Sequence, residues 1–162
     1  MTETQTLSKH EKNLSALIHA STFSKYFFPF GNFIMPLILW TANKKENNFI
    51  DHNGKQALNF QISMLLYSII LGIITVPFII GALPAFFAGH HFSFPFFFET
   101  NNFEIDFSRN GFSLIPFLWP IGISGIVYTA LSVINFVYTI LAVVKTSEGH
   151  HFKYPLTIPF IK

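Results

Sequence analysis

Amide and histidine side chains gather near the start of the longest apolar segment of the chain. His52 lies in the polar stretch that ends at Lys55, Asn59 and Gln61 follow this stretch, and Asn32 lies in an earlier apolar segment. An amide placed in an apolar helix needs a hydrogen-bonding partner, because an apolar environment offers none. We therefore expect these side chains to form interfacial hydrogen bonds that set the depth of a helix, or to contact a partner on one side of it.

Polar residues also recur along one face of a later apolar segment. At spacings of three and four residues the chain places Ser124, Tyr128, Ser132, Asn135 and Thr139, and an earlier seam holds Gln61, Ser68, Gly72 and Thr75. Small and hydroxylated residues at helical spacing let two helices approach closely and form hydrogen bonds. Close helix packing is therefore the structural interpretation of both stripes, and a hydrophilic path for a solute is the functional alternative. Neither stripe carries an acid or a base, which argues against a proton-coupled mechanism.

The chain offers little for catalysis or metal binding. It has no Cys, and the adjacent pairs His90-His91 and His150-His151 cannot place both rings on one helix face. Ser24 and Lys25 are neighbours that point in different directions on a helix, so they do not suggest a nucleophile and its base. We predict no catalytic, cofactor-binding or metal-binding residue and no cofactor, and an intramembrane enzyme is the least favoured class. A net charge of +2 with scattered basic residues argues against binding to nucleic acid.

The distribution of charge predicts the elements that must position these residues. Only 11% of the 162 residues are charged, 51% are hydrophobic and 22 are Phe. Two thirds of the chain falls in four segments without Asp, Glu, Lys or Arg, namely residues 13–24, 26–43, 56–98 and 110–144. A soluble helical domain places charges on most of its helices. The pattern therefore excludes an ordinary soluble domain and predicts an integral membrane protein.

The apolar segments predict an all-α membrane bundle with three to four transmembrane helices. About 20 apolar residues are needed to cross the hydrocarbon core as a helix, and the segments near residues 58–83 and 121–144 meet this length. Asp51 is placed to cap the first of these two helices. We predict a polar N-terminal tail over residues 1–13, a single membrane domain over 14–162 with helices at about 14–27, 30–43, 52–86 and 114–145, a Phe-rich loop over 88–113 and a polar C-terminal tail over 146–162.

The distribution of lysine predicts the sidedness of the two long helices. Lys and Arg favour the cytoplasmic side of a span, and residues 44–55 and 145–162 each hold three Lys, whereas residues 99–109 hold one Arg against three acids. We therefore expect a multi-pass protein of a bacterial inner membrane with a cytoplasmic C-terminus. The loop 88–113 is expected outside the cytoplasm, folded back onto the outer leaflet or serving as a docking site for another membrane protein.

Residues 14–42 leave two alternatives for the path of the chain. A short helical hairpin that turns at residues 28–32 would keep Lys9 and Lys12 in the cytoplasm. A single kinked span would instead place Lys25 near mid-membrane, where a charge costs at least ~2.5 kcal/mol. We favour the hairpin.

Three segments carry a resemblance to a known family. They are Pro29-Phe-Gly-Asn-Phe-Ile-Met-Pro-Leu-Ile-Leu-Trp40, Phe49-Ile-Asp-His-Asn-Gly-Lys-Gln-Ala-Leu-Asn-Phe-Gln61 and Tyr154-Pro-Leu-Thr-Ile158. Over residues 14–162 the chain resembles a bacterial domain-of-unknown-function family of small multi-pass membrane proteins, which is similar to the plastid inner-envelope import subunit Tic-twenty. The resemblance implies four helices with both termini on one side of the membrane, and it hints at a role allied to protein translocation. The long loop and Pro159 depart from the family pattern.

Two classes of function remain open. The first is a non-enzymatic interaction or scaffold protein that contacts the lipid bilayer and other membrane proteins. The second is a small transporter or channel for an unknown solute, which would act as a homo-oligomer because three or four helices enclose little volume. We favour the first, since a transporter usually shows an intramembrane charge on a polar stripe or an internal repeat. The candidate contact residues are His52, Asn59, Gln61, Asn32, Asn135 and Ser132.

Overall fold

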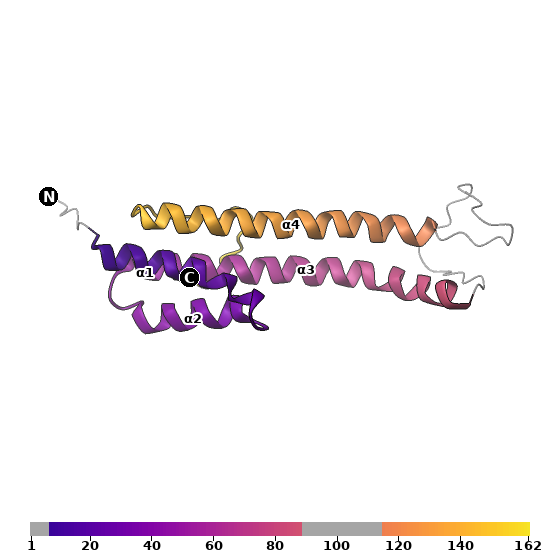
Figure 1. Ribbon diagram of the computed structural model, residues 1–162, viewed down its shortest axis with the longest axis horizontal. Helices are drawn as coiled ribbons and strands as arrows, with labels where there is room; N and C mark the ends of the chain where they lie inside the picture. Colours follow the sequence, from indigo (N-terminus) through magenta and orange to yellow (C-terminus); the bar gives the residue numbers. More distant parts are fainter. Residues whose placement is uncertain (1–6, 89–114) are drawn as a thin grey trace. The chain divides into compact units, whose positions relative to one another are not determined.

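The computed structural model describes residues 7–88 and 115–162, and every regular element in them is helical (Figure 1). The elements are α1 (Lys9–Ala20), the 3₁₀ helix η1 (Ser21–Tyr26), α2 (Gly31–Asn43), α3 (Asn48–Ala88) and α4 (Ile115–Ser147). The prediction of an all-α fold is confirmed for this part of the chain. The predicted contact of the Phe-rich loop with the outer leaflet falls on residues that lie outside the described ranges.

The start of α3 differs from the prediction because a different residue caps it. The side-chain oxygen of Asn47 accepts a hydrogen bond from the backbone N–H of Phe49 at 2.8 Å, so the helix begins at Asn48 rather than at residue 52. Asp51, the expected cap, lies in the first turn of the helix. It accepts a hydrogen bond from the indole of Trp40 at 2.9 Å and pairs with Lys55 at 2.6 Å. A contact with α2 therefore takes the place of the expected cap.

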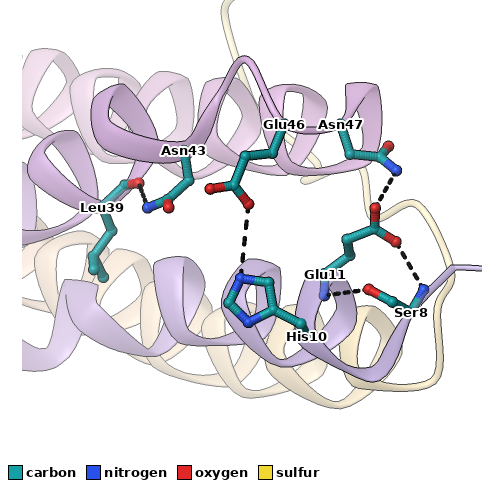
Figure 2. Close-up of polar contacts among 7 residues, drawn as sticks. All are labelled: Ser8, His10, Glu11, Leu39, Asn43, Glu46 and Asn47. Carbon is teal, nitrogen blue, oxygen red and sulfur yellow. Dashed lines mark hydrogen bonds and ion pairs between the residues drawn. The ribbon is translucent and has the colours of Figure 1, made fainter.

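A capping box starts α1 and joins it to the connector between α2 and α3 (Figure 2). The backbone N–H of Ser8 donates to one carboxylate oxygen of Glu11 at 2.7 Å, and the N–H of Glu11 donates to the Ser8 hydroxyl at 3.2 Å. The other carboxylate oxygen accepts from the amide of Asn47 at 2.6 Å. These hydrogen bonds, that of the Ser8 backbone first, hold the pKa of Glu11 below its ordinary value. A weak ion pair between His10 and Glu46 at 3.7 Å lies beside them.

The chain reverses direction between η1 and α2. Phe30 adopts the left-handed backbone conformation (φ 60°), and the N–H of Gly31 donates to the carbonyl of Phe28 at 3.2 Å. Gly31 lies so close to the backbone of Ser24 that a Cβ at this position would overlap with it. As a result α1, η1 and α2 form a helical hairpin (Figure 1). Entry of this hairpin into a membrane stays a prediction.

Two helices of the described residues are long and apolar enough to cross a membrane. They cover Asn48–Gly81 with 34 residues and Trp119–Ser147 with 29 residues. At 1.5 Å per residue, the 13 residues of α2 extend about 20 Å, which is less than the roughly 30 Å of a hydrocarbon core. A third or fourth span therefore stays a prediction.

The chain divides into two compact units, which we describe separately. Unit 1 comprises Met1–Leu66 and Ser132–Lys162, and unit 2 comprises Tyr67–Leu131. Unit 1 has a buried apolar core formed by Ile18, Trp40, Ile50, Ala57 and Leu58. In unit 2 large apolar side chains are exposed instead, as shown by Ile73 at 69% and Ile126 at 72%. An apolar surface of this kind suits contact with lipid rather than with water.

In unit 1, α2 and α3 approach closely where Gly54 faces Trp40. A Cβ on Gly54 would overlap with three carbon atoms of the Trp40 side chain. The indole is 7% exposed and is held by its hydrogen bond to Asp51. The amine of Lys44 lies 4.8 Å from the ring centroid. The absence of a side chain at Gly54 is thus what lets Trp40 fill the core of unit 1.

Candidate functional site

Four side chains of unit 1 form a hydrogen-bonded network that we call the amide–lysine cluster: Lys25, Asn32, Gln61 and Asn135. The amine of Lys25 donates to Oδ1 of Asn135 at 2.6 Å. The amide nitrogens of Asn32 and Asn135 both donate to Oε1 of Gln61, at 3.1 and 3.2 Å. Gln61 is 2% exposed and Asn135 is 5% exposed. The cluster thus holds one ammonium group and three amides in a largely buried position.

Each member of the amide–lysine cluster comes from a different element. Lys25 lies in the last turn of η1, Asn32 near the start of α2, Gln61 in α3 and Asn135 in α4. The sequence predicted Asn32, Gln61 and Asn135 as contact residues for separate reasons, and the structure brings the three together. Lys25 was not predicted as a site residue. Its signal in the sequence was its position as the only charged residue between residues 13 and 43.

Hydrogen-bond donors outnumber acceptors in the amide–lysine cluster. An ammonium group carries three N–H donors and each amide carries two, whereas each amide has a single acceptor oxygen. The oxygen of Gln61 already accepts two hydrogen bonds, and the buried Nε2 of Gln61 has no hydrogen-bond partner. An additional acceptor oxygen would therefore complete the network.

Residues 148–162, which follow α4 and which we call the C-terminal segment, dock against α3 through Asn59 and Ser63. The amide of Asn59 accepts from the backbone N–H of Ile161 at 2.8 Å and donates to the Ile161 carbonyl at 3.0 Å. The hydroxyl of Ser63 accepts from the backbone N–H of Ile158 at 2.9 Å. Asn59 was predicted as a candidate contact residue, and the partner that the structure gives it is this C-terminal segment. With 2% of its surface exposed, Asn59 has little room for another partner.

A second buried network joins α1, α3, α4 and the C-terminal segment through His19. Its two ring nitrogens lie 3.2 Å from Oδ1 of Asn53 and 2.9 Å from the hydroxyl of Tyr154. The amide nitrogen of Asn53 donates to the Phe49 carbonyl, so its oxygen faces Nε2 of His19 and also accepts from Thr146 at 3.4 Å. An amide oxygen cannot donate. His19 is therefore the neutral Nε2–H tautomer, and its Nδ1 accepts from Tyr154.

Burial lowers the pKa of His19 to about 4, and the hydrogen bond to Asn53 opposes this shift. Burial also raises the pKa of the Tyr154 hydroxyl. Both groups are therefore neutral at physiological pH, which suits a network that stabilises the fold. Sequence reasoning did not identify this network. Tyr154 was noticed only as part of a family segment, and His19 is one of several scattered histidines.

His52 and Ser132, the other predicted contact residues, lie apart from the amide–lysine cluster. The ring of His52 makes an edge contact with His151, with centroids 4.8 Å apart. Ser132 is exposed on α4, and the hydrogen bonds of the cluster do not include it. In the part of the chain that the structure describes, no group of three His, Asp or Glu residues could hold a metal ion. His90 and His91 lie outside that part.

The two polar stripes form hydrogen bonds with each other in each unit. In unit 1 the contact is the hydrogen bond between Gln61 and Asn135, at 3.2 Å. In unit 2 the hydroxyl of Thr75 donates to that of Ser124 at 2.6 Å. Tyr128 is exposed, although it belongs to the same stripe. The hydroxyl of Ser24 donates to the Ser21 carbonyl at 2.6 Å and so does not contact Lys25.

The described residues include two long apolar helices with exposed apolar faces, and unit 1 holds buried polar networks. These features define a helical membrane protein. The chain belongs to the magnetosome magnetite crystal formation protein family, which it matches over residues 10–161. The match includes all three segments on which the family resemblance was based, and it identifies a bacterial membrane-protein family. Similarity to the plastid subunit is not part of this finding and stays an expectation. No curated protein and no solved structure matches the chain.

Proposed function

We propose that this protein is a non-enzymatic scaffold of a bacterial inner membrane that acts in the formation of magnetite crystals. The process is taken from the description of the family, whose match covers nearly the whole chain. A role allied to protein translocation rests on the plastid resemblance alone, so we prefer crystal formation. Lipid and other membrane proteins would be its partners.

The observation that supports a scaffold is the use of polar side chains for internal contacts. Gln61 bonds to Asn135, Thr75 bonds to Ser124, and Asn59 bonds to the backbone of Ile161. Each contact joins two segments of the chain. Groups that bond to each other in this way hold helices together and are poorly suited to line a water-filled path.

A photo-crosslinking experiment in native membranes tests the scaffold proposal. Ile38 is a suitable position for the probe because it is 55% exposed on α2 of unit 1, whereas the buried Asn59 is not. A probe at Ile73, 69% exposed on α3 of unit 2, serves as the lipid-facing control. We expect one reproducible heteromeric product from Ile38 and none from Ile73. Products that contain only copies of this chain would contradict the scaffold role.

Gene deletion in a magnetite-forming host tests the process. We expect smaller or fewer crystals in electron micrographs of the deletion strain, and restoration of their size distribution by the wild-type chain. Crystals of unchanged number and diameter would contradict a role in crystal formation. Because crosslinking and crystal size are measured independently, failure of one part of the proposal is distinguishable from failure of the other.

The sidedness of the membrane domain follows from the lysine distribution, with the C-terminus in the cytoplasm. Because the chain contains no Cys, single cysteines introduced at exposed positions report accessibility without background. We expect a membrane-impermeant maleimide to label Lys162→Cys and Lys9→Cys only after the membrane is opened. Labelling of Lys9→Cys in intact cells would contradict the hairpin alternative for residues 14–42.

A small oligomeric transporter is the second candidate function, and one observation favours it. Lys25 bonds to Asn135 and so places a positive charge on a polar stripe, which the sequence alone did not show. An ionisable residue on such a stripe is a common feature of substrate paths. Solute flux into vesicles that contain the purified protein would support this candidate if it is abolished in Lys25→Met. Absence of flux with the wild-type protein would support the scaffold.

A further inference from the structure

The amide–lysine cluster has a charge that no acid of the described residues neutralises. The ion pairs within residues 7–88 and 115–162 are His10–Glu46, Lys55–Asp51 and Lys145–Glu148, so none involves Lys25. The amine of Lys25 has one hydrogen bond, to Asn135, and lies 5.2 Å from the ring centroid of Tyr26. The Lys25 ammonium group is therefore half-buried with N–H donors to spare, its one hydrogen-bond acceptor is a neutral amide oxygen, and the oxygen of Gln61 already accepts two hydrogen bonds.

The contact of α3 with the C-terminal segment indicates the depth of the amide–lysine cluster relative to the membrane. This segment has irregular backbone, and it bonds to Asn59 and Ser63, which lie on either side of Gln61. Lipid-exposed irregular backbone does not occur within the hydrocarbon core. From Ile62 to Gly81 the helix has a further 20 residues without a charge, about 30 Å, which is the thickness of that core. Gln61 thus lies close to the boundary between headgroups and acyl chains.

Exposed aromatic side chains adjoin the cluster at the turn of the hairpin. Tyr26, Phe27 and Phe30 are 65%, 86% and 67% exposed and lie within five residues after Lys25 in the chain. Aromatic rings concentrate at the membrane interface, where they contact acyl chains below and headgroups above. An ammonium group beside such rings matches the amphipathic structure of a phospholipid.

We propose that the amide–lysine cluster binds an oxyanion of the phosphate class, presented by an anionic phospholipid headgroup or by free phosphate. The oxyanion accepts hydrogen bonds from the ammonium of Lys25 and from the unpartnered Nε2 of Gln61. The unprotonated oxygens of a phosphate group only accept hydrogen bonds, so they supply what the cluster lacks, and their charge neutralises that of Lys25. A metal cation is excluded as the ligand by the same ammonium group. This site does not depend on the scaffold role or on crystal formation.

The binding test measures the thermal unfolding midpoint of the delipidated full chain in a neutral detergent. The probes are dioctanoyl phosphatidylglycerol, dioctanoylglycerol with the same acyl chains and no phosphate, and inorganic phosphate. A ligand that binds only the folded state raises the midpoint with its concentration. A rise with phosphatidylglycerol alone assigns the site to a lipid headgroup, and a rise with inorganic phosphate as well assigns it to phosphate from either source. An equal rise with dioctanoylglycerol, or no rise with either phosphate-bearing probe, would overturn the proposal.

Two variants of the cluster and one control sharpen this test. Lys25→Met removes the charge. Gln61→Glu keeps the size of the side chain and its acceptor oxygen, removes the two amide N–H donors and introduces a carboxylate charge that repels the oxyanion. Each should raise the dissociation constant for phosphatidylglycerol about ten- to a hundredfold, the effect of losing a charge-assisted hydrogen bond. Lys145→Met removes an exposed charge that pairs with Glu148 and should change it less than about fivefold.

Gln61→Glu keeps the test decisive if Lys25→Met does not fold. Its new carboxylate can accept the hydrogen bonds that Asn32 and Asn135 now donate to Gln61, so the variant should unfold at or above the midpoint of the wild type without ligand. Wild-type affinity for phosphatidylglycerol in a folded Gln61→Glu variant would overturn the proposal, as would an equal loss of affinity in Lys145→Met.

Discussion

Substitution of Gly54 by Ala should destabilise unit 1, although the same substitution stabilises most helices. Ala is favoured over Gly in a helix by about 0.8–1 kcal/mol. At Gly54 the new methyl group overlaps with the Trp40 side chain, and overpacking of a core costs about 1–3 kcal/mol. Displacement of the indole also breaks its hydrogen bond to Asp51, which is worth about 1.5–3 kcal/mol because the acceptor is charged. The expected net loss in the free energy of unfolding is about 2–5 kcal/mol.

The matched control is Gly72→Ala in the same helix. No atom outside the helix lies within 4 Å of the position of its Cβ, so this variant should gain up to about 1 kcal/mol. Unfolding in detergent is followed by the fluorescence of Trp40 in a Trp119→Phe background, which leaves one tryptophan of the two. In a double-mutant cycle followed by circular dichroism, since it removes the fluorescent residue, Trp40→Leu should recover part of the loss caused by Gly54→Ala. Equal stabilisation by Gly54→Ala and Gly72→Ala would refute the close approach of α2 and α3.

Three further predictions concern the polar contacts. The pKa of His19 is lowered to about 4 from an ordinary value of 6.5, so protonation of this side chain favours the unfolded state. The free energy of unfolding should be constant above pH 6.5 and fall by about 3 kcal/mol towards pH 4. His19→Gln should flatten this part of a pH titration of stability. Asn59→Leu leaves the backbone of Ile161 unpaired, so it should cost about 2–3 kcal/mol and speed tryptic cleavage after Lys153; unchanged cleavage would contradict the docking of the C-terminal segment. Thr75→Val removes the hydrogen bond to Ser124 between the two helices, together with the local one to the Leu71 carbonyl. It should lower the thermal midpoint by an amount equivalent to about 0.6 kcal/mol, and a loss above 2 kcal/mol would contradict this marginal role.

The all-α fold and the two long apolar helices were predictable because charge is absent over most of both helices. The start of α3 was not, since Asn47 and Asp51 are both residue types that cap helices. The choice between them depends on Trp40, whose indole donates to Asp51 across two helices. Tertiary contacts of this kind leave no local pattern in the sequence.

The candidate site was predictable residue by residue but not as a cluster. Amides in apolar segments stand out, which identified Asn32, Gln61 and Asn135 separately. The cluster forms through hydrogen bonds between residues far apart in the chain. Asn32 and Gln61 are separated by 29 positions, Gln61 and Asn135 by 74, and Lys25 and Asn135 by 110. Neither polar stripe carries an acid or a base of its own, but a charge from η1 reaches α4 through Lys25, which the sequence pattern of the two stripes could not show.

The docking of the C-terminal segment has a consequence for the order of events during synthesis. Asn59 and Ile161 are 102 positions apart, so at about 5–20 residues per second the ribosome needs roughly 5–20 s to supply the partner of Asn59. During that interval both long helices can enter the membrane while the amide of Asn59 and the hydroxyl of Ser63 still face water or headgroups. Closure of unit 1 then follows insertion instead of competing with it. Any factor that contacts the nascent chain in this interval would meet a polar face of α3 that the finished protein conceals.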